Sequence, residues 1–515
     1  MISPVIAPRM TTAGTTVNQG GHGRRRLARE ARPNTASPWR EDARRDRQPD
    51  SACSPARCVR PLRSSEVGRV DRCAGLSPSD EPVANEGAVV EEAALVAVAA
   101  LVFVWGTVSA RLERADLTAP IVFTALGAAL AGFGLVHPSA APETLRPLVE
   151  ITLVWVLFSD AARVRVHDLR GDLGLVLRLL VVGLPLTVLA GWGLAVWLFP
   201  AMGLWLALLV GAALAPTDAA LGVPVVTNPA VPSRIRRVIT VESGLNDGIA
   251  TPIVLVAIAG AVAAEGSGGR GAGGALVELA IGVAVGGGVG FAGGLLLRWA
   301  RRAGWAAEDF IGVAVLALAL AAYATALTVH GNGFVAAFCG GMAFGAAAGR
   351  RGPAEIVFLE QVGGAVSLLV WLAFGAIAVP LLVHRLDWTL VYAVLSLTVI
   401  RMVPVACSLI GSRLDRKTVL FVGWFGPRGL ASLVFALLAL EEIGSGADEA
   451  VAAIAATVLL SVLAHGLTAA PLATRYGRGV ASGGGRPAEI PGGDLPVRGL
   501  PRPRRSASAG HHTAS

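Results

Sequence analysis

The stretches LWLALLVGAALAPTDAALG at 204–222 and VESGLNDG at 241–248 decide how this chain folds. The first opens with a long apolar run and then meets Pro216, Thr217 and Asp218, so polar groups follow directly on a hydrophobic segment. The second places two carboxylates inside another apolar segment. A charged side chain at membrane depth costs at least ~2.5 kcal/mol, so each one indicates a structural or functional role.

The composition around these stretches indicates a membrane protein. Apolar residues make up 54% of the 515 residues and charged residues only 16%, whereas soluble domains carry roughly 25% charge. A soluble enzyme and a secreted disulfide scaffold are therefore disfavoured. The net charge of +8 lies in tails and short loops, so nucleic acid is not an expected partner. The abundance of Arg, Ala and Gly is typical of a GC-rich bacterial genome.

The apolar segments predict an all-α polytopic protein with about 13 transmembrane helices. A span needs about 20 largely apolar residues. Thirteen segments meet this length, and they run near 90–110, 119–136, 145–163, 175–198, 202–224, 237–264, 273–298, 308–329, 331–349, 358–384, 388–411, 418–441 and 449–474.

The distribution of basic residues predicts the orientation. Lys and Arg collect in cytoplasmic loops. The segments that follow odd-numbered spans hold 18 basic residues, and those that follow even-numbered spans hold 3. We therefore expect a multi-pass protein of the plasma membrane with a cytoplasmic C-terminus and a first span that begins outside.

The two ends of the chain differ from the membrane part at 88–475. Residues 476–515 are expected to form a disordered cytoplasmic tail, and residues 1–86 a disordered head with fifteen arginines. An arginine-rich head outside the cell conflicts with the orientation. We favour a start that is assigned too far upstream, and a genuine head that is translocated is the alternative.

Spacing along the sixth span separates its polar residues into two pairs. Residues four apart share a helix face, so Glu242 pairs with Asn246 and Ser243 pairs with Asp247. A carboxylate beside a hydroxyl suits a small hard cation that prefers oxygen ligands. A carboxylate beside an amide suits a structural hydrogen-bonded pair.

Each intramembrane charge also has a structural interpretation. Arg401 lies in the middle of the eleventh span and needs a buried acid, and Glu242 is the favoured partner. Asp247 has no basic partner in its own segment and is the best functional candidate. For Asp218 the alternative is a helix-end charge near the interface, and Asp160 is expected to be interfacial rather than a ligand.

Three histidines lie near span ends and are expected to have no specific role: His330, His384 and His465.

Helix breakers in two spans predict a transporter with inverted repeats. Pro216 interrupts the fifth span, and Gly426 and Pro427 interrupt the twelfth. Broken helices at matching positions in two halves are typical of such transporters. Spans one to six and eight to thirteen would be the halves, with span seven as linker. Where the breaks cross, Asp218 would offset facing N-terminal helix ends and Arg428 would offset facing C-terminal ends.

Several motifs resemble the monovalent cation:proton antiporter-1 family of bacterial sodium/proton antiporters and animal sodium/proton exchangers. They are TDAALGVPVVTNPAVPSRIRRVITVESGLNDGIATPIVL (217–255), HGNGFVAAFCGGMAFG (330–345), GWFGPRG (423–429) and HGLTAAPLA (465–473). The resemblance covers about 88–475. It implies a sodium/proton antiporter-like fold, in which a core of spans four to six and eleven to thirteen moves against a dimerisation domain. A homodimer is therefore expected, and no cofactor.

The resemblance also implies roles for residues. Asp247 matches the aspartate that binds the cation or the proton, and Ser243, Thr217 and Asp218 match residues at or beside that site. Asp247, Ser243 and Thr217 are thus the expected ligands of a monovalent cation. Gly244 stands where the family commonly has leucine, which leaves ion selectivity open.

The same comparison implies a structural group beside the ion site. Glu242 and Asn246 match the pair that holds the arginine found here at 401. An asparagine before the aspartate is associated in the family with electroneutral one-for-one exchange.

The expected function is exchange of Na+ or K+, with Li+ a further candidate, for H+. Burial disfavours an ionised carboxylate, so a proton and a cation would compete at Asp247 while the core alternates between the two sides. A cation channel and a pH sensor on the same frame remain alternatives. An enzyme is disfavoured, because the spans contain neither a metal-ligand cluster nor a nucleophile–base pair.

Overall fold

The computed structural model describes residues 81–113, 115, 117–134, 142–164, 171–218, 221–264, 271–349, 352–382 and 388–482. These residues are almost entirely helical and include no strand. The disorder expected for 1–80 and 483–515, and the expectation for His384, lie outside the described residues.

When the elements on either side of each interruption are counted together, the described helices fall into thirteen stretches at the positions of the expected spans. Eight apolar helical stretches are long enough to cross a membrane, and α2, α6 and α11 are shorter apolar helices. In chain order the elements are α1 (Glu81–Glu113), α2 (Ala119–Gly132), α3 (Pro142–Arg163), α4 (Leu173–Leu177), η1 (Arg178–Gly183), α5 (Leu184–Leu198), α6 (Leu204–Ala213), α7 (Val223–Val226), α8 (Ser233–Ala264), α9 (Gly271–Arg302), α10 (Glu308–Thr328), α11 (Gly333–Ala347), α12 (Gly352–Leu382), α13 (Trp388–Leu395), η2 (Ser396–Ile400), α14 (Arg401–Ser408), α15 (Arg416–Trp424), α16 (Leu430–Ile443), η3 (Gly444–Ala447) and α17 (Asp448–Ser482).

Two expected boundaries are wrong. Helix α1 begins at Glu81, inside the segment assigned to the head, and α17 continues to Ser482, inside the segment assigned to the tail. The extension of α17 has a packing reason, because Tyr476 stacks on Phe421 of α15 with ring centroids 4.1 Å apart. An apolar-length criterion detects where a bilayer could be crossed and not where a helix ends.

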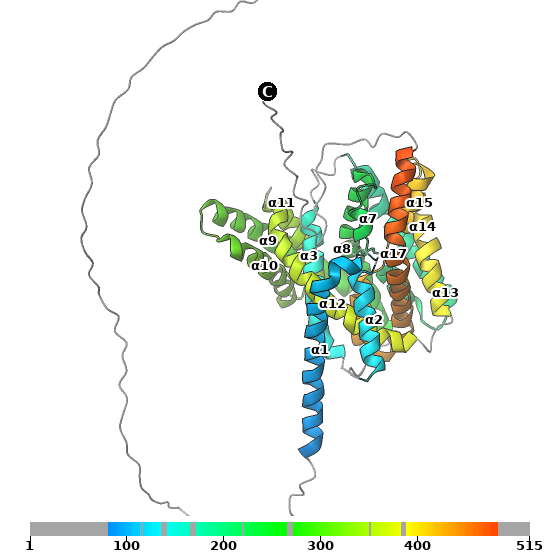
Figure 1. The fold of residues 1–515 in the computed structure, drawn as a ribbon. Coiled ribbons are helices and arrows are strands. Elements are labelled where there is room, and N and C mark those ends of the chain that lie inside the picture. The colour runs from blue at the N-terminus through cyan, green and yellow to red at the C-terminus, as the bar shows by residue number, and fades with distance from the viewer. Residues whose placement is uncertain are drawn as a thin grey trace, which may run out of the picture. The chain divides into compact units, whose positions relative to one another are not determined.

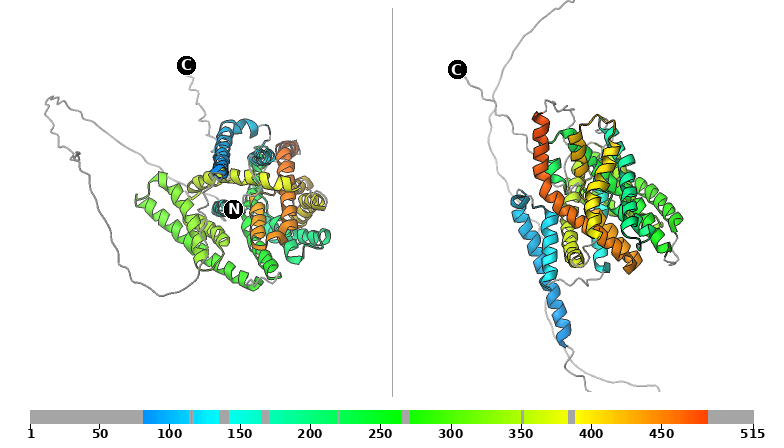
Figure 2. Two further views of the ribbon diagram at one scale, coloured as in Figure 1. Left: turned by 90° about the horizontal axis from the view of Figure 1, so that it is seen from below. Right: turned by 90° about the vertical axis from the view of Figure 1, so that its right-hand side faces the viewer.

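Contacts divide the helices into two groups. The core group comprises α4 to α8 and α13 to α17, and the flanking group comprises α2, α3 and α9 to α12. Figure 1 shows α9, α10 and α11 together on one side and α13, α14, α15 and α17 together on the other, and the left view of Figure 2 agrees. Small residues allow close packing within the flanking group: a Cβ added at Gly290 of α9 would overlap the carbonyl oxygen of Gly340 of α11.

Both broken spans occur where the helix breakers predict them. The fifth span is interrupted between α6 and α7, and the twelfth between α15 and α16. The two breaks touch, because the backbone N–H of Asp218 donates to the carbonyl oxygen of Pro427 at 2.8 Å. Proline removes a helical donor on each side, and the freed backbone groups find partners in the opposite break.

The spans preceding the two breaks share a second irregularity. The fourth span contains the π-helical segment η1 and the eleventh contains η2, which runs directly into Arg401 at the start of α14. Such π segments frequently occur at functional sites. The core group therefore contains the same structural pattern twice: a span with a π-helical segment, followed by a broken span.

Candidate functional site

Hydroxyl groups from the fifth and sixth spans meet at the centre of the core group. The Oγ1 of Thr217, in the break after α6, lies 2.9 Å from the Oγ of Ser243 on α8. Asn246 of α8 donates from Nδ2 to the same Thr217 Oγ1 at 2.8 Å. All three side chains are buried. The break therefore brings a second segment to the polar face of α8.

Asp247 lies one turn after Ser243 on α8 and is 8% exposed. Its backbone carbonyl accepts a hydrogen bond from Thr251 Oγ1 at 2.7 Å. The next residue, Pro252, has no N–H, so the carbonyl of Gly248 lacks its helical donor. A carboxylate, hydroxyl groups and a carbonyl without a helical donor thus lie within adjacent turns, and all are oxygen ligands suited to a hard cation.

Asp160 lies closer to this centre than its position at the end of a span suggests. It belongs to α3 of the flanking group and is half-buried. A Cβ added at Gly244 would lie 3.6 Å from the Cβ of Asp160. Helix α3 therefore packs directly against α8 beside Ser243, at ordinary contact distance from position 244.

A bidentate ion pair lies on the adjacent face of α8. Arg401 is 2.8 Å from Glu242 between Nη1 and Oε1, and donates from Nη2 to Oε2 at 2.9 Å. Glu242 is 1% exposed and Arg401 is 2% exposed. The two opposite charges therefore neutralise each other inside the core group.

The expectation that Asn246 also holds Arg401 is wrong. The amide nitrogen of Asn246 donates to Thr217 instead, and its Oδ1 has no hydrogen-bond partner in the structure. The Nε of Arg401 likewise has none. Helix spacing places Asn246 on the face of Glu242, but its Nδ2 meets Thr217 of the unwound segment and its Oδ1, the atom that could accept from Arg401, meets no donor.

Arg428 lies between the two broken spans and is fully buried. Its Nη1 donates to the carbonyl oxygens of Ala215 and Pro216, at 3.1 Å and 3.0 Å. These carbonyls follow the C-terminal end of α6. Arg428 itself follows the C-terminal end of α15, so a positive charge stands where two negative helix ends meet.

Asp218 takes the complementary position at a helix N-terminus. Its Oδ2 accepts a hydrogen bond from the backbone N–H of Leu430, the first residue of α16, at 3.2 Å. Gly429 makes this approach possible, because an added Cβ there would overlap that same Oδ2. The acid is thus bound to the opposite break and does not lie at an exposed helix end.

His465 has specific partners, and the expectation that it has none is wrong. It lies near the middle of α17 and is buried. Its Nε2 lies 2.9 Å from the carbonyl oxygen of Trp424, the last residue of α15, and its Nδ1 lies 3.1 Å from Ser461 Oγ. The same Ser461 Oγ accepts from the backbone N–H of Arg428 at 2.7 Å. The spacing of four residues between Ser461 and His465 was the available signal.

Two further features connect or flank the helix groups. Arg146 of α3 forms ion pairs with Glu150, at 2.7 Å, and with Glu441 of α16, so it joins the flanking group to the core group. A cavity of about 360 Å³ beside this link is lined by Glu150, Glu278 and Glu442 among others. Acidic side chains thus gather at one boundary between the groups.

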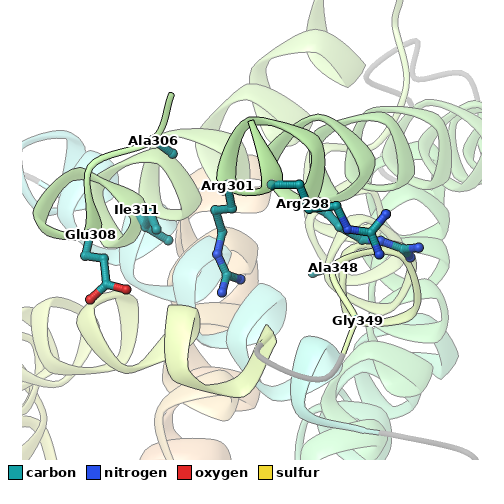
Figure 3. A pocket seen from close by; sticks show the side chains of 8 residues that line it. Arg298, Arg301, Ala306, Glu308, Ile311, Ala348 and Gly349 are labelled. Atoms are coloured by element: carbon teal, nitrogen blue, oxygen red, sulfur yellow. The ribbon is translucent and has the colours of Figure 1, made fainter. Parts of the chain in front are cut away.

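A hollow of about 580 Å³ at the end of α9 has the opposite character (Figure 3). Arg298, Arg301 and Arg302 line it, with Glu308 of α10 opposite them. Arg301 is paired with Glu355 of α12. The surplus of positive charge makes this hollow unsuitable for a cation.

Known proteins resemble the chain over most of its membrane part. The family model described as "Sodium/hydrogen exchanger, transmembrane" matches residues 97–475. The K(+)/H(+) antiporter NhaP of Alkalimonas amylolytica is 27% identical over 308 residues, which are 58% of this chain and 51% of that protein. The K(+)/H(+) antiporter NhaP2 of Shewanella oneidensis is 29% identical over 296 residues, 55% and 50% of the two chains. The chain thus spans about half the length of these relatives.

A solved structure shows the fold. The sodium proton antiporter MjNhaP1 from Methanocaldococcus jannaschii at pH 8 superposes with a TM-score of 0.60 at 21% identity, over 75% of this chain and 99% of that one. This match agrees with the crossed, broken helices of the core group. From the extent of the family match, which includes both breaks and the polar face of α8, the chain belongs to the sodium/hydrogen exchanger family.

Proposed function

We propose that this protein exchanges a monovalent cation for a proton across the membrane by alternating access, with Asp247 as the group at which the two compete. One observation carries the proposal. The buried carboxylate of Asp247 shares a face of α8 with Ser243, and the hydroxyl of Ser243 contacts the hydroxyl of Thr217 in the broken fifth span. The names of the relatives as K(+)/H(+) antiporters and of the solved structure as a sodium proton antiporter support it.

The cation would be held by oxygens at the centre of the core group. Ionised Asp247 provides the negative charge, and Ser243 and Thr217 provide hydroxyl oxygens in place of the water shell of the ion. Asp218 orders the break that carries Thr217. Asp160, from the flanking group, would add a second carboxylate at the approach to the site.

Protonation of Asp247 ends cation binding because it removes the charge that offsets the loss of hydration. The core group therefore carries either a cation or a proton. The neighbouring residues Asn246 and Asp247 supply only one carboxylate, because Asn246 is neutral and donates to Thr217. On that basis we propose one-for-one, electroneutral exchange of Na+ or K+ for H+.

The arginines beside the site act on the protein rather than on the ion. Arg401 is neutralised by Glu242, so it does not repel a cation at the adjacent face. Arg428 binds carbonyl oxygens of the opposite break and so fixes the crossing. These roles are structural, and they predict loss of folding when the side chains are removed.

Alternating access would require the core group to move against the flanking group. The ion pair between Arg146 and Glu441 joins the groups at one boundary, so it must break when that boundary opens. We further propose that the side with the basic loops faces the cytoplasm, in the plasma membrane, and that the protein is a homodimer. A C-terminal reporter fusion and crosslinking in native membranes test these two points.

Proton flux in everted membrane vesicles tests the exchange. Vesicles with a respiration-generated pH gradient receive sodium, lithium or potassium salts in turn. We expect one cation to collapse the gradient with wild-type protein and none to do so with Asp247→Asn. Asp448→Asn, the same change at an exposed position in the first turn of α17, is the matched control and should behave as wild type.

The alternatives give different results in this flux assay, in electrical recordings of reconstituted protein and in measurements of proton-linked structural change. Exchange that persists in Asp247→Asn would remove this residue from the site. Currents far above transporter turnover would indicate a cation channel. Proton-linked structural change without flux, in protein shown to be folded in the membrane, would indicate a pH sensor.

A further inference from the structure

A large cavity lies in the core group away from the candidate ion site. It has a volume of about 1150 Å³ and is enclosed by the start of α8, by the α14–α15 segment and by the end of α17. All three segments lie at the side of the arginine-rich loops. The cavity thus opens where a bilayer headgroup region meets the basic side of the protein.

The rim of the cavity carries uncompensated positive charge. Arg234, Lys417 and Arg475 line it, against one acid, Asp415. Arg234 bonds to Asp172 at 2.9 Å, and Asp415 caps α15 by accepting from the backbone N–H of Thr418. Lys417 and Arg475 are exposed, and no described residue forms an ion pair or hydrogen bond with either side chain.

The rest of the lining is mainly apolar. Leu420 is 58% exposed and lies one turn from Lys417, and Phe421 and Leu472 continue the surface inward. Met402 and Phe425 also line the cavity. A cationic rim above an apolar floor fits an amphiphile with an anionic head, and basic pockets between membrane helices are typical sites for anionic lipids.

We propose that this cavity binds an anionic phospholipid from the leaflet on the basic side. Lys417 and Arg475 would hold the phosphate, and an acyl chain would lie on Leu420, Phe421 and Leu472. A free phosphate would leave this apolar surface in contact with water.

Charge argues against the chain's own tail as the occupant. Residues 483–515 follow α17 directly and contain five arginines and two acidic residues. A basic segment does not complement a basic rim. A zwitterionic lipid would leave the two exposed charges uncompensated, so the anionic lipid is the favoured occupant.

The position of the cavity links its occupant to the twelfth span. Phe425 follows the last residue of α15, and Met402 follows Arg401 in α14. An acyl chain that touches Met402 and Phe425 would pack where α15 stops and the break begins. If the proposed exchange function holds, the anionic lipid would stabilise the broken helix and raise the exchange rate.

The test measures phosphatidylglycerol retained by the purified full-length protein after delipidation and titration, read by native mass spectrometry. The Lys417→Gln, Arg475→Gln double variant should bind about 25-fold more weakly, at roughly fivefold for each basic residue near an anionic headgroup. Arg416→Gln, Arg478→Gln is the matched control: the residues lie on the same helices, are exposed and do not line the cavity. It should change binding less than threefold.

A filling variant tests the cavity without a change of charge. A Cβ added at Gly479 meets no atom within 4 Å, although this residue lines the cavity. Gly479→Phe should therefore occupy the space, keep the fold and reduce retained phosphatidylglycerol at least as much as the double variant. Equal melting temperatures across the set establish that folding is unchanged.

Other results would overturn the proposal. An equal loss of retained phosphatidylglycerol in the cavity variant and in its matched control would mean that the lipid is attracted to the basic surface in general. Glycerol phosphate that competes as well as the lipid would mean a soluble anion site. Lipid binding that occurs only after removal of 483–515 would mean that the tail occupies the cavity. Absence of exchange in folded wild-type protein, with lipid binding as expected, would refute the proposed transport function and leave the lipid site standing.

Discussion

The buried ion pair of Glu242 and Arg401 predicts that removing one charge destabilises the protein more than removing both. The side chains are 1% and 2% exposed and join through two contacts, of 2.8 Å and 2.9 Å. Arg401→Ala leaves the carboxylate buried without its partner, which costs about 3–5 kcal/mol. Glu242→Gln leaves the guanidinium in the same situation. We expect each single variant to lower protein yield and melting temperature strongly.

Removing both charges should restore much of the lost stability. Buried ion pairs replaced by uncharged side chains of similar volume are often neutral in stability. The Arg401→Met, Glu242→Gln double variant should therefore melt closer to wild type than Arg401→Met alone or Glu242→Gln alone, the two single variants that complete the comparison. The measurement is the melting temperature of detergent-purified protein, followed by fluorescence-detected size exclusion.

Two results would refute this reasoning. Additive losses in the double variant would show that the two side chains are not energetically coupled. A well-folded Arg401→Ala protein with a shifted apparent cation affinity would show that Glu242 and Arg401 belong to the binding site.

Three shorter predictions concern the crossing and the boundary between the groups. Gly426→Ala should lower the melting temperature because its Cβ would overlap the Nε of the paired arginine, whereas Gly423→Ala, whose Cβ meets its nearest neighbour at 3.6 Å, should not. Arg428→Gln should cost about 1.5–3 kcal/mol, the value of hydrogen bonds from a charged donor, and should reduce exchange in vesicles. Arg146→Gln should change the exchange rate about fivefold or less, because the arginine side chain is 44% exposed and such pairs contribute about 0.2–1 kcal/mol. Arg111→Gln is its control.

The sequence predicted the spans and both breaks because each depends on local chemistry. A bilayer requires a minimum apolar length, and a proline inside such a run removes a backbone donor wherever it occurs. Thirteen spans and the interruptions at Pro216 and Pro427 follow from these two requirements alone. The choice of Glu242 as the acid for Arg401 followed from the cost of an unpaired charge.

The remaining features of the site depend on how helices are rotated against each other, which spacing along one helix does not specify. Asn246 faces Thr217 because the unwound segment approaches α8 from that side. Asp160 reaches α8 because α3 packs against α8 beside position 244. His465 reaches the end of α15 because the middle of α17 packs against that end. Each depends on the packing of a second helix.

Several hydrogen bonds join the two breaks to each other. Asp218 uses its backbone N–H toward Pro427 and its carboxylate toward Leu430, while Arg428 reaches back to the carbonyls before Asp218. Each irregular segment thus supplies the hydrogen bonds that the other has lost, in a region where water cannot. Separating the breaks would expose several buried polar groups at once, so the crossing should move as one unit. We infer that Thr217 keeps its place beside Ser243 through the transport cycle, and that access to the site changes at the boundary with the flanking group.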